Sequence, residues 1–595
     1  MRDLERNSIR FTAIASFLAV ILFFTFFFMS FLQRQVYNYD FWWHLATGKL
    51  IIENKALPEA DPFSYTTHET PSSRKTVILK GYWLAQVIFY KIYENWDIIG
   101  IIMLRAICMT LFLFFVFLAI KKQGLSDLPS LLILTGVFII SMGYLGEIPQ
   151  LFTMLFFSIT LYILEDFRLN RTKKIFLIPP MMVLLSNMHP GYIVCILLLS
   201  IYVIGEGVNF LIRKGRDKKS FINLLIVGVS APLLSLINPY GFKVIEVLIL
   251  LEEHAPGIVA HMSPFTIYAS KFKPVDYSYV LFLFLSLGNL LYWKKNGIVP
   301  LLVVSAFAAL SSTGLRYIVF FMSVSAPFIA SVAANLREEK PVKRFLSSIN
   351  HGHVIVSAAV FFAGAFLVLS SIPKLAKYEF KTDTSFSAPK DAADFITPLK
   401  ISGNMFNEYG FGGYLIWRLY PGKKVFIDGR SLDPDVYKEY NVIAAAMEEQ
   451  GRSWEDIMRK YNISYIISPP LLPRGEIIPI VEKALWSDDW ALIYRDQLSL
   501  IFLRKADENM PLIHQFGMDK KEALNTIIVQ ASARAKINSA NPYYLITLGK
   551  VFLKSGRLSD AEKAFEMAYQ RDPHNPIIRE WLLKIRETKE RTGSE

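Results

Sequence analysis

The chain has 595 residues, of which 53% are hydrophobic, 14% aromatic and 19% charged. Soluble domains carry about 25% charged residues, so this composition excludes a chain that is soluble throughout. The two cysteines, Cys108 and Cys195, lie in apolar runs, which excludes a disulfide scaffold and a cysteine-ligated metal site. The net charge of +13 does not indicate nucleic acid, because the basic residues of a membrane protein gather in its cytoplasmic loops.

Eleven apolar runs are predicted to be membrane spans, since about 20 apolar residues cross the ~30 Å hydrocarbon core of a bilayer. The first run ends in the bulky, basic sequence Phe31-Leu32-Gln33-Arg34, which favours an uncleaved anchor over a signal peptide. Several runs are short, so tilt or partial burial is assumed for them. The runs are Phe11–Leu32, Ile98–Ile120, Leu131–Tyr144, Leu151–Leu164, Ile175–Leu185, Tyr192–Ile212, Ile222–Ile237, Tyr279–Tyr292, Ile298–Leu310, Tyr317–Leu336 and Val354–Ser371.

The positions of lysine and arginine predict how the chain crosses the membrane. Counted over eleven spans, the strongly basic short loops fall on one side, among them Lys121-Lys122 and residues 168–174. Cytoplasmic loops carry such an excess. The N-terminus is therefore predicted on the cytoplasmic side of the cell (inner) membrane, and the chain beyond Pro373 on its extracytoplasmic side. Residues 1–372 then form the transmembrane domain, with long external loops at 33–97 and 238–276.

Beyond the last span, strand-like and helix-like runs alternate, which predicts an extracytoplasmic α/β domain over residues 373–508. Asp428 and Arg430 follow a predicted strand, either where open α/β sheets bind ligands or as a strand-end turn with a local ion pair. The predicted strands are Gly403–Phe406, Lys424–Ile427, Tyr465–Ser468, Ala491–Tyr494 and Ser499–Leu503. The predicted helices are Tyr414–Leu419, Val436–Glu449, Trp454–Tyr461 and Ile478–Leu485.

Residues 509–595 are predicted to form a helical tail with a tetratricopeptide (TPR)-like repeat. Small residues at Gly549 and Ala561 let two helices approach each other. A repeat of this kind stacks on its neighbours and suits partner binding, so the tail predicts a protein partner and no chemistry. The residues that match the consensus, over one repeat of about 34 residues, are Leu548-Gly549, Phe552, Gly556, Ala561, Phe565, Ala568 and Pro573.

The residues that follow the first span carry the clearest sign of chemistry. The sequence Tyr39-Asp40-Phe41-Trp42-Trp43-His44 places an acidic residue at the membrane surface, where it is costly unless it is used. Asp40 and His44 are four residues apart and share one face of a helix. A carboxylate beside an imidazole can deprotonate an acceptor hydroxyl or hold a divalent cation. The alternative is an aromatic-belt helix that Asp40 caps and in which His44 packs.

This arrangement resembles the GT-C superfamily of membrane glycosyltransferases in its many spans, its long first external loop opening with Asp40, and its external C-terminal domain. The resemblance implies transfer of a sugar from a polyprenyl-phosphate carrier on the extracytoplasmic side. Asp40 has no second acidic neighbour, which does not fit a paired-acid metal site unless Asp61 folds back to supply the partner. More narrowly, a group of large bacterial membrane proteins with tetratricopeptide tails is similar in Asp40–Gly48, Asp61–Tyr65, Pro149–Thr153, Gly412–Tyr414 and Phe426–Arg430.

Further external residues are predicted to bind the substrate. Arg316 opens the tenth span on the external side, against the positive-inside tendency, and its guanidinium suits a lipid-linked phosphate. The alternative is a snorkelling interfacial arginine. Trp43, Asp61 and His189 are predicted to line the substrate site, although a capped turn also accounts for His189. Glu147 sits at a tight external turn and is a further candidate for the same cavity.

The cofactor is unknown from the sequence, and a divalent cation, Mg or Mn, is compatible with the acidic residues. The fourth external loop offers metal-type ligands whose spacing matches no defined site, so an exposed polar helix face is favoured there. These ligands are Glu252, Glu253, His254 and His261.

The predicted function is therefore that of a glycosyltransferase, which transfers a hexosyl or pentosyl group from a lipid-linked donor with Asp40 and His44 as catalytic residues. Its predicted partners are the lipid-linked sugar donor and membrane lipid, with no nucleic acid. The alternative is a non-catalytic, membrane-anchored scaffold for envelope or polysaccharide assembly, which recruits partners through its α/β and TPR-like regions. A solute transporter is disfavoured, because the charged residues concentrate at span ends rather than at the membrane midplane.

Overall fold

The computed structural model describes residues 2–67, 71–144, 146–212, 217–249, 264, 274–341, 343, 352–376, 388–449 and 451–592. The chain forms two compact units. Unit 1 comprises Met1–Glu59 and Pro71–Thr382, and unit 2 comprises Ala60–Thr70 and Asp383–Glu595. A short piece of the first predicted external loop therefore belongs to unit 2. The predicted parts on either side of residue 508 also fall together in unit 2.

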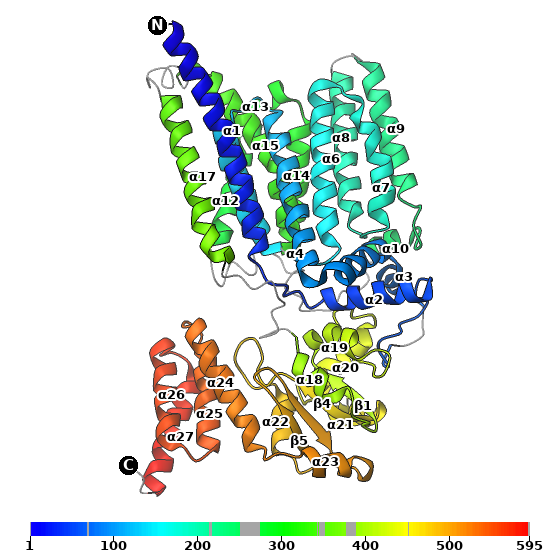
Figure 1. Ribbon diagram of the computed structural model, residues 1–595, viewed down its shortest axis with the longest axis vertical. Helices are drawn as coiled ribbons and strands as arrows, with labels where there is room; N and C mark the ends of the chain where they lie inside the picture. Colours follow the sequence, from blue (N-terminus) through cyan, green and yellow to red (C-terminus); the bar gives the residue numbers. More distant parts are fainter. Residues whose placement is uncertain are drawn as a thin grey trace. The chain divides into compact units, whose positions relative to one another are not determined.

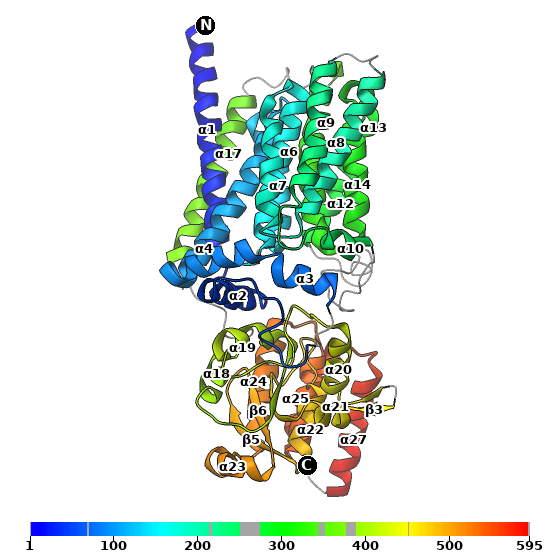
Figure 2. The ribbon, with the colours of Figure 1, turned by 90° about the vertical axis from the view of Figure 1, so that its right-hand side faces the viewer.

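Unit 1 is helical. Its long helices lie side by side in a bundle, while α2 (Phe41–Asn54) and α3 (Ser73–Lys80) lie across one end of the bundle (Figure 1, Figure 2). The other described elements are α1 (Arg2–Leu32), α4 (Trp83–Lys121), α5 (Asp127–Ser141), η1 (Met142–Tyr144), α6 (Gln150–Asn170), η2 (Lys173–Leu177), α7 (Ile178–Ser186), α8 (Tyr192–Ile212), α9 (Lys218–Leu234), α10 (Lys243–Ile249), α12 (Pro274–Ser286), α13 (Asn289–Asn296), α14 (Val299–Thr313), η4 (Leu315–Tyr317), α15 (Ile318–Glu338) and α17 (Gly352–Ala376).

Within the described residues, seven helical stretches are long and apolar enough to cross a membrane. All seven coincide with predicted spans, so the protein is a polytopic, α-helical membrane protein. The other four predicted spans fall on the shorter helices α7, α9, α12 with α13, and α14. The count of eleven spans and the orientation of the chain stay predictions. The seven stretches are Thr12–Leu32, Ser73–Lys121, Asp127–Tyr144, Gln150–Asn170, Tyr192–Ile212, Leu315–Glu338 and Ala358–Ala376.

Helix α4 changes direction at Asp97, whose backbone (φ 50°, ψ −150°) is not helical. The predicted span begins at the next residue, Ile98, so we treat only the part of α4 after this bend as membrane-spanning. The part before the bend ends at Trp96, which is 65% exposed, and tryptophan is enriched at membrane–water interfaces. Helix α2 packs closely on this first part, because a Cβ at Gly48 would come within 2.1 Å of the Gln86 carbonyl oxygen.

Unit 2 contains a four-stranded mixed sheet in the order β1–β4–β6–β5. β1 (Asn404–Asn407) runs parallel to β4 (Ile463–Ser468), whereas β6 (Leu500–Arg504) is antiparallel to both β4 and β5 (Trp490–Arg495). The short strands β2 (Glu448–Glu449) and β3 (Arg452–Ser453) form a separate pair. The other elements are α18 (Lys390–Ile396), η5 (Tyr409–Phe411), α19 (Gly412–Leu419), α20 (Pro434–Ala444), α21 (Trp454–Lys460), α22 (Pro479–Trp486), η6 (Asp507–Asn509), α23 (Met510–Phe516), α24 (Lys521–Ile537), α25 (Tyr543–Lys554), α26 (Leu558–Arg571) and α27 (Pro576–Thr592).

Four of the five predicted strands coincide with β1, β4, β5 and β6, and the strand predicted at Lys424–Ile427 is different. That segment makes only an isolated parallel bridge between Val425 and Ser64. Its neighbouring backbone groups are taken by a side chain, because the Asn407 amide accepts from the Phe426 N–H (2.8 Å) and donates to the Ile427 carbonyl (2.8 Å). The segment therefore lies beside β1 without joining the sheet.

One apolar core runs through unit 2 from the sheet into the C-terminal helices. It joins Phe406 of β1 and Phe502 of β6 to Ile527 of α24 and Phe565 of α26. In the predicted repeat, Gly549 of α25 faces Phe565, and a Cβ at this glycine would come within 2.5 Å of the ring. The small residue therefore allows the close approach of these two helices, while their assignment to a tetratricopeptide repeat stays a prediction.

Candidate active site

Asp40 stands immediately before helix α2, at its N-cap position, but its side chain makes no capping hydrogen bond. Its carboxylate instead accepts a hydrogen bond from the indole N–H of Trp43 (3.0 Å), and its backbone N–H donates to the Asn38 side chain (2.9 Å). The Asp40 side chain is half-buried. The alternative prediction, that the Asp40 side chain caps the helix, is therefore wrong.

His44 lies one turn further along α2 and is 3% exposed. Its Nδ1 is 3.1 Å from Nε2 of Gln86 at the start of α4. The close approach at Gly48 explains why Gln86 lies under α2. The glutamine amide therefore engages Nδ1 of the imidazole. Gln86 lies 42 positions from His44 in the sequence, so no local pattern predicts this contact.

An aromatic cluster connects α2 with the turn between α7 and α8. The Tyr82 ring lies 5.9 Å from the Trp43 ring, 5.1 Å from His44 and 5.6 Å from His189, between ring centroids. A hydrogen bond from the indole of Trp83, the first residue of α4, to the Asn187 side chain (2.8 Å) ties the residue next to Tyr82 to the same turn. Two of the predicted residues on α2 and one that is more than a hundred positions away therefore meet around Tyr82.

His189 is held as a neutral imidazole. Its Nδ1 accepts a hydrogen bond from the Gly191 N–H (3.0 Å) and lies 2.8 Å from the Thr153 hydroxyl. Burial, with the charge of Arg316 adding to it, lowers the pKa of His189 to about 3. Because Nδ1 accepts, the proton of the neutral ring is on Nε2. His189 thus presents an uncharged N–H donor rather than a cation.

Arg316 lies on the short helix η4, between α14 and α15. The Tyr144 hydroxyl donates a hydrogen bond to the Leu315 carbonyl and so ties η4 to η1, which follows α5. The Arg316 guanidinium lies 4.7 Å from the centre of the Tyr317 ring and donates to its hydroxyl (2.6 Å). It is half-buried, which fits a cation that is held in place at a surface rather than one that extends freely into solvent.

The electrostatics of Tyr82 connect Asp40 with Arg316. Burial raises the pKa of the Tyr82 phenol to about 12, and Asp40 adds to the rise while Arg74 and Arg316 oppose it. The carboxylate and the guanidinium that were predicted to share a site therefore act on the same phenol. Arg74, from α3, was not predicted, and it adds a second positive charge near this position.

Three of the six predicted site residues, Trp43, His44 and His189, lie around the Tyr82 ring in unit 1. Asp40 is joined to Trp43 by a hydrogen bond, and the charges of Asp40 and Arg316 both act on the Tyr82 phenol. The sixth, Asp61, lies in unit 2. Glu147 is fully buried and forms an ion pair with Arg105 of α4, so it does not line an open cavity.

Asp61 is part of a buried ionic cluster within unit 2. Its carboxylate lies 2.8 Å from the Arg430 guanidinium, which also donates to both carboxylate oxygens of Asp428 (2.7 and 2.6 Å). All three side chains are at most 3% exposed. Burial raises the pKa of Asp61, but the charge and hydrogen bond of Arg430 outweigh it, so this pKa lies below its usual value. The local ion pair expected of Asp428 and Arg430 is present, with Asp61 as a further member.

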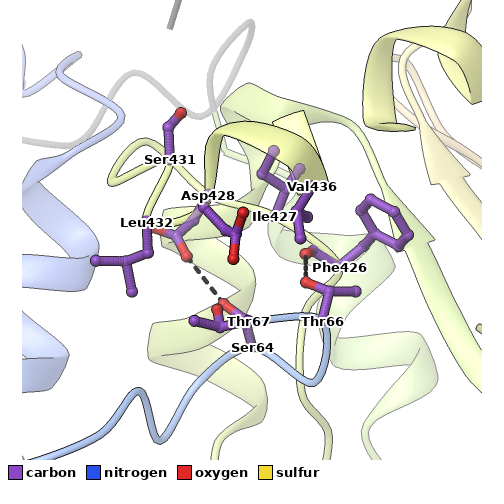
Figure 3. Close-up of a pocket in the computed structure, with 10 residues that line it drawn as sticks. Ser64, Thr66, Thr67, Phe426, Ile427, Asp428, Ser431, Leu432 and Val436 are labelled. Atoms are coloured by element: carbon purple, nitrogen blue, oxygen red, sulfur yellow. Dashed lines mark hydrogen bonds between the residues drawn. The ribbon is translucent and has the colours of Figure 1, made fainter. Parts of the chain in front are cut away.

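A small cavity lies next to this cluster (Figure 3). Asp428 accepts from the Ser64 hydroxyl (3.4 Å) and Thr66 donates to the Phe426 carbonyl (2.5 Å) across it, as the dashed lines in Figure 3 mark. The space has room for about one water molecule, so it is too small for a sugar. It lies where residues 64–67 pack against residues 426–436 of unit 2.

The described residues do not supply a metal site by themselves. No group of three or more histidine, cysteine, aspartate or glutamate side chains that could hold an ion occurs among them. Asp40 brings one carboxylate, and the neighbouring His44 uses Nδ1 for Gln86. The predicted ligands of the fourth external loop, from Glu252 to His261, lie outside the described residues.

No family model matches the sequence, and no curated protein does either. Among solved structures, the archaeal oligosaccharyltransferase AglB from Archaeoglobus fulgidus, in complex with an inhibitory peptide and a dolichol-phosphate, is similar with a TM-score of 0.52. The two share 11% sequence identity over 95% of this chain and 86% of AglB. The fold is GT-C-like. The mycobacterial arabinofuranosyltransferase AftD is also similar, with a TM-score of 0.47 and 12% identity over 84% of this chain and 42% of AftD.

The GT-C-like fold agrees with the resemblance predicted from the first external loop. At this level of identity, the likeness concerns the fold and transfers no residue roles. The roles of the residues around Tyr82 therefore depend on the geometry of this chain alone.

Proposed function

We propose that this protein is a membrane glycosyltransferase that takes a sugar from a polyprenyl-phosphate-linked donor and acts on the extracytoplasmic face. The observation that supports the proposal is that Tyr82 connects groups from separate elements. Its ring contacts the neutral imidazole of His189 and the indole of Trp43, which is bonded to the Asp40 carboxylate, and the charges of Asp40 and Arg316 act on its phenol. A carboxylate can act as a general base, and a guanidinium and an N–H donor can stabilise a leaving phosphate. The GT-C-like fold supports the same class of reaction.

In the proposed reaction, the acceptor hydroxyl attacks the anomeric carbon of the donor. A bond from the acceptor oxygen to this carbon forms, the bond from the carbon to the phosphate oxygen breaks, and the acceptor proton passes to Asp40 as general base. Arg316 neutralises the leaving lipid phosphate through charge-assisted hydrogen bonds. The Nε2–H of His189 adds a neutral donor to the same phosphate, and His44 and Trp43 keep the Asp40 end of α2 in place.

Unit 2 is proposed to be the extracytoplasmic part of the enzyme. Its α/β sheet and helical tail share one core, so the tail is a fixed surface of this unit. We propose that the TPR-like helices bind a protein partner of the cell envelope. Asp61, which was predicted to bind substrate, is assigned to the stability of unit 2, because its carboxylate is occupied by Arg430.

The test is transfer by the purified full-length protein with a panel of polyprenyl-phosphate sugars, measured as release of the lipid phosphate, with and without EDTA. Asp40→Asn should lower the rate by about 10²–10⁴-fold, the usual contribution of a general base. Asp127→Asn is the matched control, since Asp127 also stands at a helix start but pairs with Lys121. Full activity of Asp40→Asn would overturn the assignment. Absence of transfer with every donor would favour the scaffold alternative.

A further inference from the structure

The segment that carries Asp40 begins where α1 ends. The last carbonyl groups of a helix have no partner within the helix, and a backbone polar group that is buried must be paired. At the end of α1, the Arg105 guanidinium supplies the partner. It donates to the Phe31 carbonyl (2.9 Å), to the Arg34 carbonyl and, more weakly, to that of Gln35 (3.4 Å). One side chain of α4 thus holds three backbone carbonyls within residues 31–35, in the segment that leads to Asp40.

Arg105 is fully buried, and its charge is balanced by Glu147. This glutamate lies in the turn before α6, and both side chains of the pair are 0% exposed. A buried charge is costly unless a counter-ion and hydrogen bonds compensate it. Glu147 provides the counter-ion, and the carbonyls at the end of α1 accept the hydrogen bonds. The ion pair and the backbone at the end of α1 are therefore held together by the same arginine side chain.

The turn that carries Glu147 also touches the segment directly. A Cβ at Gly146 would lie 2.8 Å from the Asn38 side-chain nitrogen, so Asn38 packs against this turn. The Asn38 side-chain oxygen in turn accepts the backbone N–H of Asp40 (2.9 Å). The Asp40 segment is therefore held at its start by Arg105 and near its end by the turn of Glu147.

We propose that Arg105 and Glu147 are positioning residues for Asp40, which fix residues 33–40 between α1 and α2 without touching the substrate. This role rests on the proposed function of Asp40. The arrangement is suited to it, because an arginine fork can satisfy several carbonyls in a fixed geometry, and misplacement of a catalytic group by about 1 Å can lower a rate on the order of 100-fold.

The test uses a double variant of the full-length protein, Arg105→Met with Glu147→Leu. Replacing both members of a buried pair leaves no unpaired charge, so folding and insertion are spared, while the carbonyls at the end of α1 lose their partner. The matched control is Arg171→Met with Glu206→Leu, which removes another buried-glutamate pair of unit 1 that lies between α6 and α8. Two readouts are taken, namely hydrogen–deuterium exchange of residues 33–44 and the separate values of kcat and KM.

In the Arg105/Glu147 variant, we expect faster exchange of residues 33–44 with unchanged exchange in α8, and a kcat lowered on the order of 100-fold at unchanged KM. The control pair should change neither readout. Unchanged exchange of residues 33–44 would overturn the positioning role whether or not the wild type shows transfer. Faster exchange with undiminished kcat would also overturn it. A wild type without transfer, or an active Asp40→Asn variant, would instead count against the proposed function.

Discussion

Replacing Arg430 with methionine should destabilise unit 2 more than replacing Asp61 with asparagine. Among the residues that the structure describes, Arg430 is the cation that pairs with both buried carboxylates, those of Asp61 and Asp428. Without it, two acidic groups that are at most 3% exposed face each other with no positive charge between them. With asparagine at position 61, Arg430 keeps its two hydrogen bonds to Asp428, so no buried charge loses its only partner.

The magnitudes follow from what each change leaves behind. Breaking a buried ion pair by removing one partner costs about 3–5 kcal/mol, and Arg430→Met belongs near the upper value because two carboxylates are affected. Asp61→Asn removes the charge and keeps one acceptor oxygen. That oxygen can still accept the Phe63 N–H (3.1 Å), while the Thr67 hydroxyl (3.0 Å), which bonds to the other carboxylate oxygen, loses its acceptor. A hydrogen bond to a charged group contributes about 1.5–3 kcal/mol, so we expect a loss of about 2 kcal/mol.

The assay is denaturant unfolding of the full-length protein in detergent, followed by the proteolytic susceptibility of residues 383–595. The double variant, Asp61→Asn with Arg430→Met, should lose less unfolding free energy than the sum of the two single losses. The reason is that Asp61→Asn removes one of the two buried carboxylates that Arg430→Met leaves unpaired. The pH dependence has a fixed sign. The pKa of Asp61 is lowered in the folded state, so its contribution is present above the unfolded pKa near 3.9 and is lost as the pH falls through the folded value. Equal losses for both single variants would refute this reasoning.

Three further outcomes are expected. Gly549→Ala should destabilise unit 2 by about 1–3 kcal/mol, as overpacking does, because the new Cβ meets the Phe565 ring at 2.5 Å; proteolytic susceptibility measures it, and an unchanged value would contradict the close helix contact. His189→Gln should flatten the pH dependence of the free energy of unfolding between pH 6.5 and 4. The pKa of His189 is lowered to about 3 in the folded protein, so its contribution to stability is present above about pH 6.5. Below that pH the contribution falls by at most about 1.4 kcal/mol per pH unit. Glu165→Leu should lower the free energy of unfolding of unit 1 by about 3–5 kcal/mol, because it leaves the buried Arg168 without its carboxylate. The double variant, Glu165→Leu with Arg168→Leu, should recover part of this loss. No recovery would argue against a charge effect.

Consecutive residues carried most of the fold prediction. A span must be an apolar run whatever its neighbours are, because lipid offers no partner for polar groups. All seven helical stretches of sufficient length in the described part of the chain coincide with predicted runs. The strands that form the sheet were likewise visible as short apolar runs. The segment Lys424–Ile427 looked the same, but the Asn407 side chain took two of its backbone groups, and no local pattern indicates such a partner.

The candidate site was predictable only as a set of separate residues. Asp40, Trp43 and His44 are close in the sequence, and helical spacing places them together. His189 and Arg316 were identified as polar residues at external turns, without any measure of their distance from Asp40. Tyr82, whose ring contacts three of the predicted residues, stood in an aromatic stretch that resembles ordinary interface material. The chain contains many such tyrosines, so only the packing of α4 against α2 selected this one.

By itself, the sequence determined which segments form long apolar helices and that an acidic residue follows the first of them, since both depend on the chemistry of adjacent residues. The tertiary structure decided which partner each buried charge has. Arg430 reaches Asp61 across 369 positions of the chain, and Arg105 reaches Glu147 across 42. A buried charge must find its counter-ion in space rather than along the chain, and for this reason Asp61 became part of the core of unit 2 while Asp40 stayed at the candidate site.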